Sequence, residues 1–185
     1  MKKAALLQDL IAADVALLAA ALRARSARIA SAESCTGGGI AAACTDLAGS
    51  SDWFDCGIVS YSNSAKTSLL GVDAGLLITH GAVSEAVAGA MATGLLARCR
   101  ADLVVAVTGV AGPGGGNAAK PVGTVWLAWA WRTADGALQT DTLLQRFDGD
   151  RYAVRQATVA CALQGLLDRA DLLVPGTPTS TPRTA

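Results

Sequence analysis

Apolar residues at the amino-terminal end of the chain follow the spacing of an α-helix. Side chains three and four positions apart share one face of a helix, so this pattern predicts an amphipathic helix over residues 4–24. Asp9 and Asp14 interrupt the apolar run, which excludes the continuous core of a signal peptide. The periodic positions are Leu6, Leu7, Leu10, Ile11, Leu17, Leu18 and Leu22.

Shorter apolar runs predict the strands. Residues 103–107 (LVVAV) are continuously apolar and rich in branched side chains, which is typical of a strand covered on both faces. Weaker patterns predict four further strands, at residues 27–32, 57–61, 122–131 and 138–146. An Asp-Gly turn separates the last two, and this turn predicts that they form a hairpin.

Helices are predicted between these strands. A small apolar segment up to Leu47 follows a run of glycines, and three more helical segments begin at polar residues that favour the N-cap position. The three segments are 62–70 with Ser62 at its cap, 84–100 with Ser84 at its cap, and 151–167 after Asp150.

The order of predicted elements is αβαβααβββα. Helices that alternate with strands and then a closing hairpin predict an α/β fold, a three-layer α/β/α sandwich with a mixed sheet of about five strands. A chain of 185 residues without an internal linker is predicted to form a single domain, here residues 1–170. Residues 171–185 are expected to form a disordered tail, because PGTPTSTPRTA is rich in proline and threonine.

Composition and charge restrict the possible partners. Hydrophobic residues make up 52% of the chain and charged residues 16%, which excludes a mainly disordered protein. The formal net charge is +0 and no basic run occurs beyond Lys2 and Lys3, so nucleic acid is not expected as a partner. No stretch reaches the ~20 continuous apolar residues that span a bilayer, so a membrane is not expected either. A homo-oligomer is expected, because alanine-rich helices leave small apolar surfaces.

The cysteines and the single histidine do not predict a metal site. The five cysteines have irregular spacing without a CxxC pair, and His80 stands alone before Gly81 in a predicted loop. Reduced thiols in a cytoplasmic protein are therefore expected, with no metal and no cofactor.

The glycine-rich segment after the buried strand does not fit a dinucleotide fingerprint. Gly112 and Gly114 have the right spacing, but Asn117 replaces the third glycine and Pro121 prevents a helix from following. The pattern GxxxxGK[ST] is also absent. The segment nevertheless lies at the carboxyl end of a predicted strand, where α/β proteins bind ligands.

The turn from Glu33 to Gly39 is a second candidate site, because it connects a predicted strand to the start of a helix. Free N–H groups at a helix N-terminus favour anions and oxyanions. Ser34 and Thr36 could act chemically here or could only cap the helix. Cys35 is an alternative nucleophile, since a thiol at a helix N-terminus has a lowered pKa.

Tyr61 and Lys66 form a further cluster after the next predicted strand. A lysine packed against apolar groups loses charge stabilisation, so its pKa falls and its amine can serve as a base for a serine. The alternatives are an ordinary surface lysine on a helix and a tyrosine whose hydroxyl lies in solvent.

Seven motifs occur in a fixed order over about Leu6 to Leu167. They are AESCTGG (32–38), AGSSDWF (48–54), GIVSYSNSAK (57–66), HGAVSE (80–85), TGVAGPGGG (108–116), KPVGTVW (120–126) and FDGDR (147–151). Together they resemble the C-terminal domain of the competence/damage-inducible CinA proteins, whose stand-alone members are nicotinamide-nucleotide amidohydrolases. The resemblance implies the stand-alone form, because the chain has no room for the N-terminal domain of the longer CinA proteins.

The resemblance implies an activity and a set of residues. The activity is hydrolysis of the carboxamide of nicotinamide mononucleotide (NMN), which gives nicotinate mononucleotide and ammonia. The implied catalytic residues are Ser34 as nucleophile, with Lys66 and Tyr61 as base, and amides near residues 36–38 as oxyanion donors. The candidate substrate-binding residues are Glu33, Thr36, Gly37, Gly38, Thr108, Gly109, Gly112, Lys120 and Arg151.

Two alternatives remain at this stage. In the first, amide hydrolysis proceeds with Cys35 as nucleophile in place of Ser34. In the second, the chain is a non-catalytic module that binds pyridine nucleotides or regulates a competence or damage response.

Overall fold

The computed structural model describes residues 2–173 of the chain, with side chains from Leu6 onward. The predicted tail from Pro175 lies outside the described residues. Asp171 and Leu172 belong to a turn after the last helix, and Leu173 is buried in the core. The described residues therefore extend three positions past the predicted boundary at residue 170.

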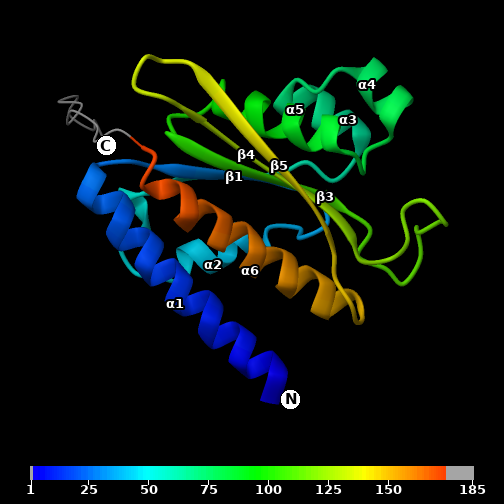
Figure 1. The fold of residues 1–185 in the computed structure, drawn as a ribbon, viewed down its shortest axis with the longest axis horizontal. Helices are drawn as coiled ribbons and strands as arrows, with labels where there is room; N and C mark the ends of the chain where they lie inside the picture. The colour runs from blue at the N-terminus through cyan, green and yellow to red at the C-terminus, as the bar shows by residue number, and fades with distance from the viewer. Residues whose placement is uncertain (1, 174–185) are drawn as a thin grey trace.

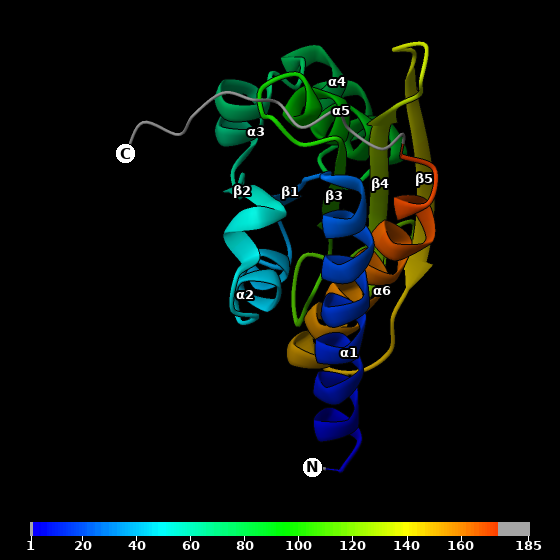
Figure 2. The same cartoon turned by 90° about the vertical axis from the view of Figure 1, so that its left-hand side faces the viewer.

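A mixed five-stranded sheet forms the centre of the molecule, with strand order β2-β1-β3-β4-β5. The strands are β1 (Ile29–Glu33), β2 (Phe54–Val59), β3 (Leu103–Gly109), β4 (Thr124–Arg132) and β5 (Leu138–Arg146). β1 pairs in parallel with both β2 and β3, whereas β4 is antiparallel to its two neighbours. Figure 2 shows the strands side by side in this order. The parallel pairings place the carboxyl ends of β1, β2 and β3 at the same end of the sheet.

Helices cover both faces of this sheet (Figure 1). One face carries α1 (Lys2–Arg25), α2 (Gly39–Thr45) and α6 (Arg151–Ala170), and the other carries α3 (Asn63–Leu70), α4 (Ala74–His80) and α5 (Glu85–Leu96). The predicted three-layer α/β/α sandwich with a mixed sheet is thereby confirmed.

The position of β3 between two layers of helices explains why its sequence is continuously apolar. Val105 and Val107 pack in the cluster beneath α1 and α6, while Val104 and Ala106 pack in the cluster beneath α5. Successive side chains of a strand point to opposite faces, so a strand covered by helices on both sides needs apolar residues at every position.

The predicted caps are confirmed at three helices. Ser62, Ser84 and Asp150 each accept a hydrogen bond from a backbone amide in the first turn of the helix that follows. Helix α4 was not predicted, and His80 is its last residue rather than part of a loop. The helix has only seven residues with one buried apolar side chain, Leu77, so its sequence carries too little periodicity to be recognised.

Helix α1 buries one face and exposes the other. Val15, Leu18 and Leu22 pack in the core, whereas Leu10 and Leu17 are more than half exposed. The exposed leucines give α1 an apolar outer stripe that agrees with the expected homo-oligomer, which stays a prediction. Among residues 2–173, no helix combines the length and apolarity needed to cross a membrane.

The contact between α6 and β4 depends on a glycine. A Cβ atom at Gly165 would overlap the indole ring of Trp129, whose Nε1 donates a 3.2 Å hydrogen bond to the carbonyl oxygen of Ala162. The absence of a side chain therefore lets α6 lie directly on the ring.

We expect Gly165→Ala to lower the free energy of unfolding by about 1–3 kcal/mol, because either the ring or the helix must shift. Urea denaturation measures this change. Gly89→Ala is the matched control, since Gly89 is also helical and a Cβ there meets nothing within 4 Å. The control should gain up to about 1 kcal/mol from helix propensity, and a loss at Gly89 equal to that at Gly165 would contradict the packing argument.

Candidate active site

The carboxyl ends of β1, β2 and β3 bring three chain segments together. Ser34 follows β1, and its amide donates a 3.1 Å hydrogen bond to the carbonyl oxygen of Val107 in β3. Ser60 follows β2, and its amide donates a 2.8 Å bond to the carbonyl oxygen of Glu33. Backbone pairing thus fixes Ser34 between the two neighbouring strand ends, at the edge where α/β sheets bind ligands.

Lys66 points from α3 into this junction. Its side chain is 1% exposed, and its Nζ lies 3.0 Å from Oγ of Ser34 and 2.6 Å from the carbonyl oxygen of Ser60. Ser62 caps the start of α3, and Lys66 therefore lies in the first turn of that helix. The sequence could not distinguish this lysine from a surface residue, and the structure places it in contact with Ser34.

The environment of Lys66 makes its ammonium form easier to deprotonate than that of a lysine in water. Burial lowers the pKa of Lys66 from its ordinary value of 10.5, while nearby Cys35 acts in the opposite direction. Over the described part of the chain, the amine forms no ion pair with a carboxylate. Without a negative partner the ammonium form is destabilised, so the amine is suited to accept a proton from Ser34.

Glu33 does not face the ligand side of this junction. Its carboxylate is fully buried and accepts five hydrogen bonds, which come from the hydroxyls of Ser31 and Thr36 and from the amides of Gly38, Ile40 and Ala41. Three of these donors belong to the start of α2, where free N–H groups favour a negative charge. The structure therefore assigns Glu33 to holding the turn and α2 rather than to contact with a ligand.

The hydrogen bonds within the turn determine which of its backbone amides remain available to a ligand. The Gly38 amide donates to Glu33, and the Gly37 amide donates a 3.1 Å bond to the carbonyl oxygen of Ser34. The amides expected as oxyanion donors at these two glycines are thus already used. The amides of Cys35 and Thr36, directly after Ser34, donate to no oxygen atom within residues 2–173.

Arg155 stabilises this turn from α6. Its Nη2 donates a 2.6 Å hydrogen bond to the carbonyl oxygen of Thr36. This contact was not predicted, because Arg155 lies 119 positions from Thr36 and is one arginine among several on the helix.

Tyr61 and Arg151 form the outer rim of the site. The Tyr61 side chain is 61% exposed, and its hydroxyl accepts a 3.2 Å hydrogen bond from Nη2 of Arg151. Nη1 of Arg151 donates a 2.9 Å bond to the carbonyl oxygen of Gly112 in the glycine-rich loop. The phenol thus contacts Arg151, whereas the amine of Lys66 reaches the serine directly.

Two further predicted residues connect the loops around the site. The hydroxyl of Thr108 donates a 2.8 Å bond to the carbonyl oxygen of Ala82, and Nζ of Lys120 donates a 2.8 Å bond to that of His80. Both bonds link the β3 side of the site to the segment between α4 and α5.

A cleft of about 220 Å³ opens over these groups. Six of the predicted site residues line it: Ser34, Tyr61, Lys66, Thr108, Gly109 and Arg151. The other six lie around the cleft and do not line it: Glu33, Thr36, Gly37, Gly38, Gly112 and Lys120. The cleft is also lined by Cys35, Ala82, Val83 and Ala111, and Ala82 and Val83 were missed because their side chains carry no reactive group.

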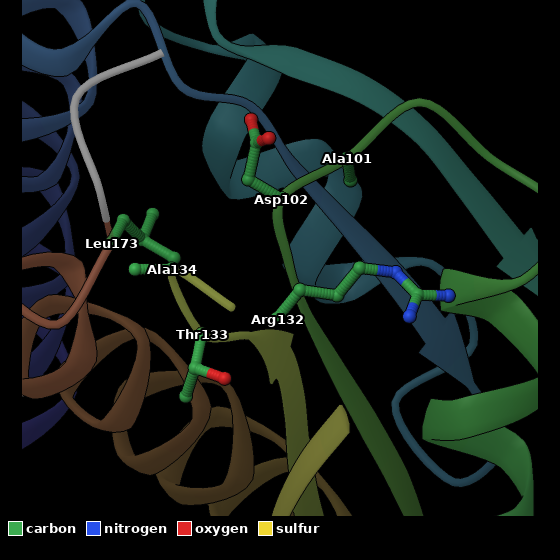
Figure 3. Close-up of a pocket in the computed structure, with 6 residues that line it drawn as sticks. All are labelled: Ala101, Asp102, Arg132, Thr133, Ala134 and Leu173. Atoms are coloured by element: carbon green, nitrogen blue, oxygen red, sulfur yellow. The ribbon is translucent and has the colours of Figure 1, made fainter. Parts of the chain in front are cut away.

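A second hollow of about 230 Å³ lies at the opposite end of β3 (Figure 3). Asp102 and Arg132 supply its charged groups, and the Arg132 guanidinium extends away from Leu173 and Ala134. This hollow has no nucleophile beside a base, so the cleft at Ser34 is the candidate active site.

The thiol of Cys35 is poorly suited to act as a nucleophile. Burial raises the pKa of Cys35 to about 11, an effect that outweighs the lowering by the backbone amides of Cys35 and Thr36. Only a small fraction of the thiol is ionised near neutral pH, and the thiolate is the reactive form.

An α/β sheet whose strand ends hold a serine in contact with a buried lysine defines a class of site, in which an amine can activate a hydroxyl nucleophile. The family model described as the CinA C-terminal domain matches residues 12–170. The chain belongs to the CinA C-terminal domain family.

Individual relatives agree with this assignment. The chain is 51% identical over 146 residues to Nicotinamide-nucleotide amidohydrolase PncC of Escherichia coli K12, covering 79% of this chain and 86% of the relative. It is 54% identical to the PncC protein of Pseudomonas putida, covering 79% and 88%. Among solved structures, a competence/damage-inducible protein of Agrobacterium tumefaciens matches with TM-score 0.79 and 43% identity, covering 86% of this chain and 94% of that one.

A substitution at Glu33 tests whether its buried carboxylate stabilises the turn between β1 and α2. We expect Glu33→Gln to lower the free energy of unfolding by about 1–3 kcal/mol, because the neutral amide loses charge-assisted bonds and directs its NH2 group at donors. Urea denaturation measures the change.

Glu85→Gln is the matched control for this prediction. Glu85 is exposed and accepts one hydrogen bond, from the hydroxyl of Thr142. The free energy of unfolding of this variant should differ from that of the unmodified protein by no more than about 0.5 kcal/mol. Equal losses in the two variants would show that the Glu33 carboxylate has no special structural role.

Proposed function

We propose that this chain is an amidohydrolase that converts nicotinamide mononucleotide and water into nicotinate mononucleotide and ammonia. The observation that carries the proposal is the 3.0 Å contact between Nζ of buried Lys66 and Oγ of Ser34 in the cleft. The relatives named Nicotinamide-nucleotide amidohydrolase PncC, at 51% and 54% identity, support the choice of substrate.

The first step is attack by Ser34 on the carboxamide carbon. Neutral Lys66 takes the hydroxyl proton as the Oγ–C bond forms. The positive charge of the pyridinium ring near Lys66 disfavours the ammonium further, which helps to keep the base neutral before attack. The direct contact supports proton transfer without a relay, and Tyr61 has its own partner in Arg151.

The carboxamide oxygen becomes an oxyanion in the tetrahedral intermediate. The amides of Cys35 and Thr36 are its proposed donors, because those of Gly37 and Gly38 are already bonded within the turn. An amide directly after a nucleophile serves the same purpose at other strand-to-helix turns.

The intermediate collapses when Lys66 returns its proton to the leaving nitrogen. The C–N bond breaks, ammonia departs, and an ester between Ser34 and the nicotinoyl group remains. Water then attacks this ester with Lys66 again as base, which releases the carboxylate product and restores the hydroxyl of Ser34.

The charged groups at the rim suit the nucleotide part of the substrate. Arg151 is the rim cation that lines the cleft, and its guanidinium can bind a phosphate through two parallel hydrogen bonds. It would exchange its present bonds to Tyr61 and Gly112 for bonds to the phosphate. Lys120 and the amides of the 109–116 loop are the remaining phosphate donors in this proposal.

Two rival functions are distinguished by the same assay. A Cys35 nucleophile is disfavoured by the raised pKa of the Cys35 thiol, which is about 11. A non-catalytic binding module would have no use for a serine in contact with a lysine that forms no ion pair within the described residues 2–173.

The decisive measurement is ammonia release from NMN in the presence of EDTA. We expect activity in the unmodified protein, a loss of roughly 10³-fold or more in Ser34→Ala, and retained activity in Cys35→Ala. Loss in Cys35→Ala with retention in Ser34→Ala would assign the nucleophile to the thiol. Tight NMN binding without ammonia release by the folded protein would favour the binding module.

The pH dependence tests the role of Lys66. Because the neutral amine is the active form, kcat/KM should rise about tenfold per pH unit until the pKa of Lys66 is passed. That limb should lie below pH 10.5, since burial lowers the pKa. Steady-state kinetics over a pH series measures it.

Two variants complete this test. Lys66→Arg should abolish activity, because a guanidinium keeps its proton. Tyr61→Phe should leave the position of the rising limb unchanged, as the phenol bonds to Arg151 rather than to the amine. A limb that moves in Tyr61→Phe would assign the titrating group to Tyr61 instead.

A further inference from the structure

A second group of reactive side chains lies away from the cleft. The carboxylate of Asp55 and the thiols of Cys56 and Cys99 have ligand atoms that all lie within 4.8 Å of one another. Asp55 and Cys56 belong to β2, and Cys99 lies in the connection between α5 and β3. All three are partly buried, so the cluster is held by the fold and stays open to solvent on one side.

A bulge in β2 explains how neighbouring residues reach the same point. Phe54 pairs with Ile29 and Cys56 pairs with Ala30, so Asp55 has no partner in the register. Adjacent side chains of a regular strand point to opposite faces, whereas an extra residue in a bulge redirects its side chain. The bulge therefore allows the carboxylate of Asp55 to lie beside the thiol of Cys56.

Backbone amides also hold Asp55 and Cys99 in place. Oδ2 of Asp55 accepts a 3.0 Å hydrogen bond from the amide of Arg100, which leaves lone pairs of the carboxylate for another partner. Burial raises the pKa of Cys99, but the amides of Ala101 and of Cys99 itself act in the opposite direction. Bonds of this kind hold ligands in place around protein-bound metals.

We propose that Asp55, Cys56 and Cys99 form a binding site for a thiophilic divalent cation, Zn²⁺ in the first instance. Two thiolates and one carboxylate provide three of the four ligands of a tetrahedral site, and water completes the coordination from the open side. Soft sulfur ligands select Zn²⁺ or Cd²⁺ over Mg²⁺ and Ca²⁺.

The charges around the cluster are compatible with this ion. Three anionic ligands and one divalent cation leave one surplus negative charge. Nη1 of Arg28 lies 3.9 Å from Oδ1 of Asp55, so the guanidinium can offset this surplus. Within residues 2–173 this is the only ion pair that Asp55 forms, and both side chains are partly exposed, so Arg28 can move aside as the ion enters.

The site stands apart from the proposed catalytic chemistry. The cluster lies at the amino end of β2, whereas Ser60 and Tyr61 follow its carboxyl end. Cys56 and Ser60 are four positions apart along an extended chain, which corresponds to roughly 13 Å. The ion would connect the edge strand β2 to the segment before β3, and its role is structural. Sequence spacing gave no sign of the site, because Cys56 and Cys99 are 43 positions apart and become neighbours only through the sheet.

The test is a titration of the full-length protein with Cd²⁺ and with Zn²⁺, after removal of metal by EDTA and in the presence of a phosphine reductant. Cd²⁺ reports thiolate ligands through its ultraviolet charge-transfer band, and Zn²⁺ is measured by competition with a chromogenic chelator. We expect saturation at one equivalent and loss of the band in both Cys56→Ser and Cys99→Ser. Asp55→Asn should keep the band but bind Zn²⁺ more weakly.

Cys161→Ser is the matched control, because Cys161 is also a partly buried thiol but lies on α6. It should bind both ions like the unmodified protein.

Three results would overturn the proposal. They are the absence of saturable binding at one equivalent, a band that survives Cys56→Ser and Cys99→Ser, and a band that disappears in Cys161→Ser. Circular dichroism of each variant verifies that it is folded, so a lost band is not mistaken for a lost fold. Ammonia release from NMN should persist in EDTA whichever result is obtained, so the two proposals fail independently.

Discussion

The buried carboxylate of Glu33 is the constraint on which the active-site region depends. A negative charge removed from water is tolerated only when donors surround it, and five hydroxyl and amide groups do so here. Because three of those donors are amides at the start of α2, the requirement determines where the helix begins. The turn between β1 and α2 then has one way to fold, and that way places Ser34 at the sheet edge.

Lys66 is a buried ionisable group of a different kind. Glu33 is stabilised by its donors, whereas Lys66 faces carbonyl and hydroxyl oxygens without a carboxylate among the residues that the structure describes. Burial therefore lowers the pKa of the amine, and the proposed chemistry uses this effect. The two buried groups have different roles at the site. Glu33 holds the geometry of the turn, and Lys66 provides the base in the proposed mechanism.

The parallel half of the sheet has two ends with different properties. Its carboxyl ends carry the cleft and, in our proposal, the hydrolysis of an amide. Its amino ends carry the bulge of β2 and the group of one carboxylate and two thiols. A metal ion there would hold β2, which is an edge strand of the sheet that the described residues form, while the catalytic groups at the other end remain unaffected.

Local sequence determined the elements whose signals are local. Hydrophobic periodicity predicted α1, and a continuous apolar run predicted β3. Capping residues predicted the starts of α3, α5 and α6, and the motifs identified Ser34, Tyr61 and Lys66 together as candidates. Short elements with few buried residues, such as α4 and the early part of β2, carried too weak a pattern. The burial of Lys66, the saturation of Glu33 and the meeting of Cys56 with Cys99 were decided only by tertiary structure, because each depends on contacts between segments that are separated in the chain and are brought together by the sheet.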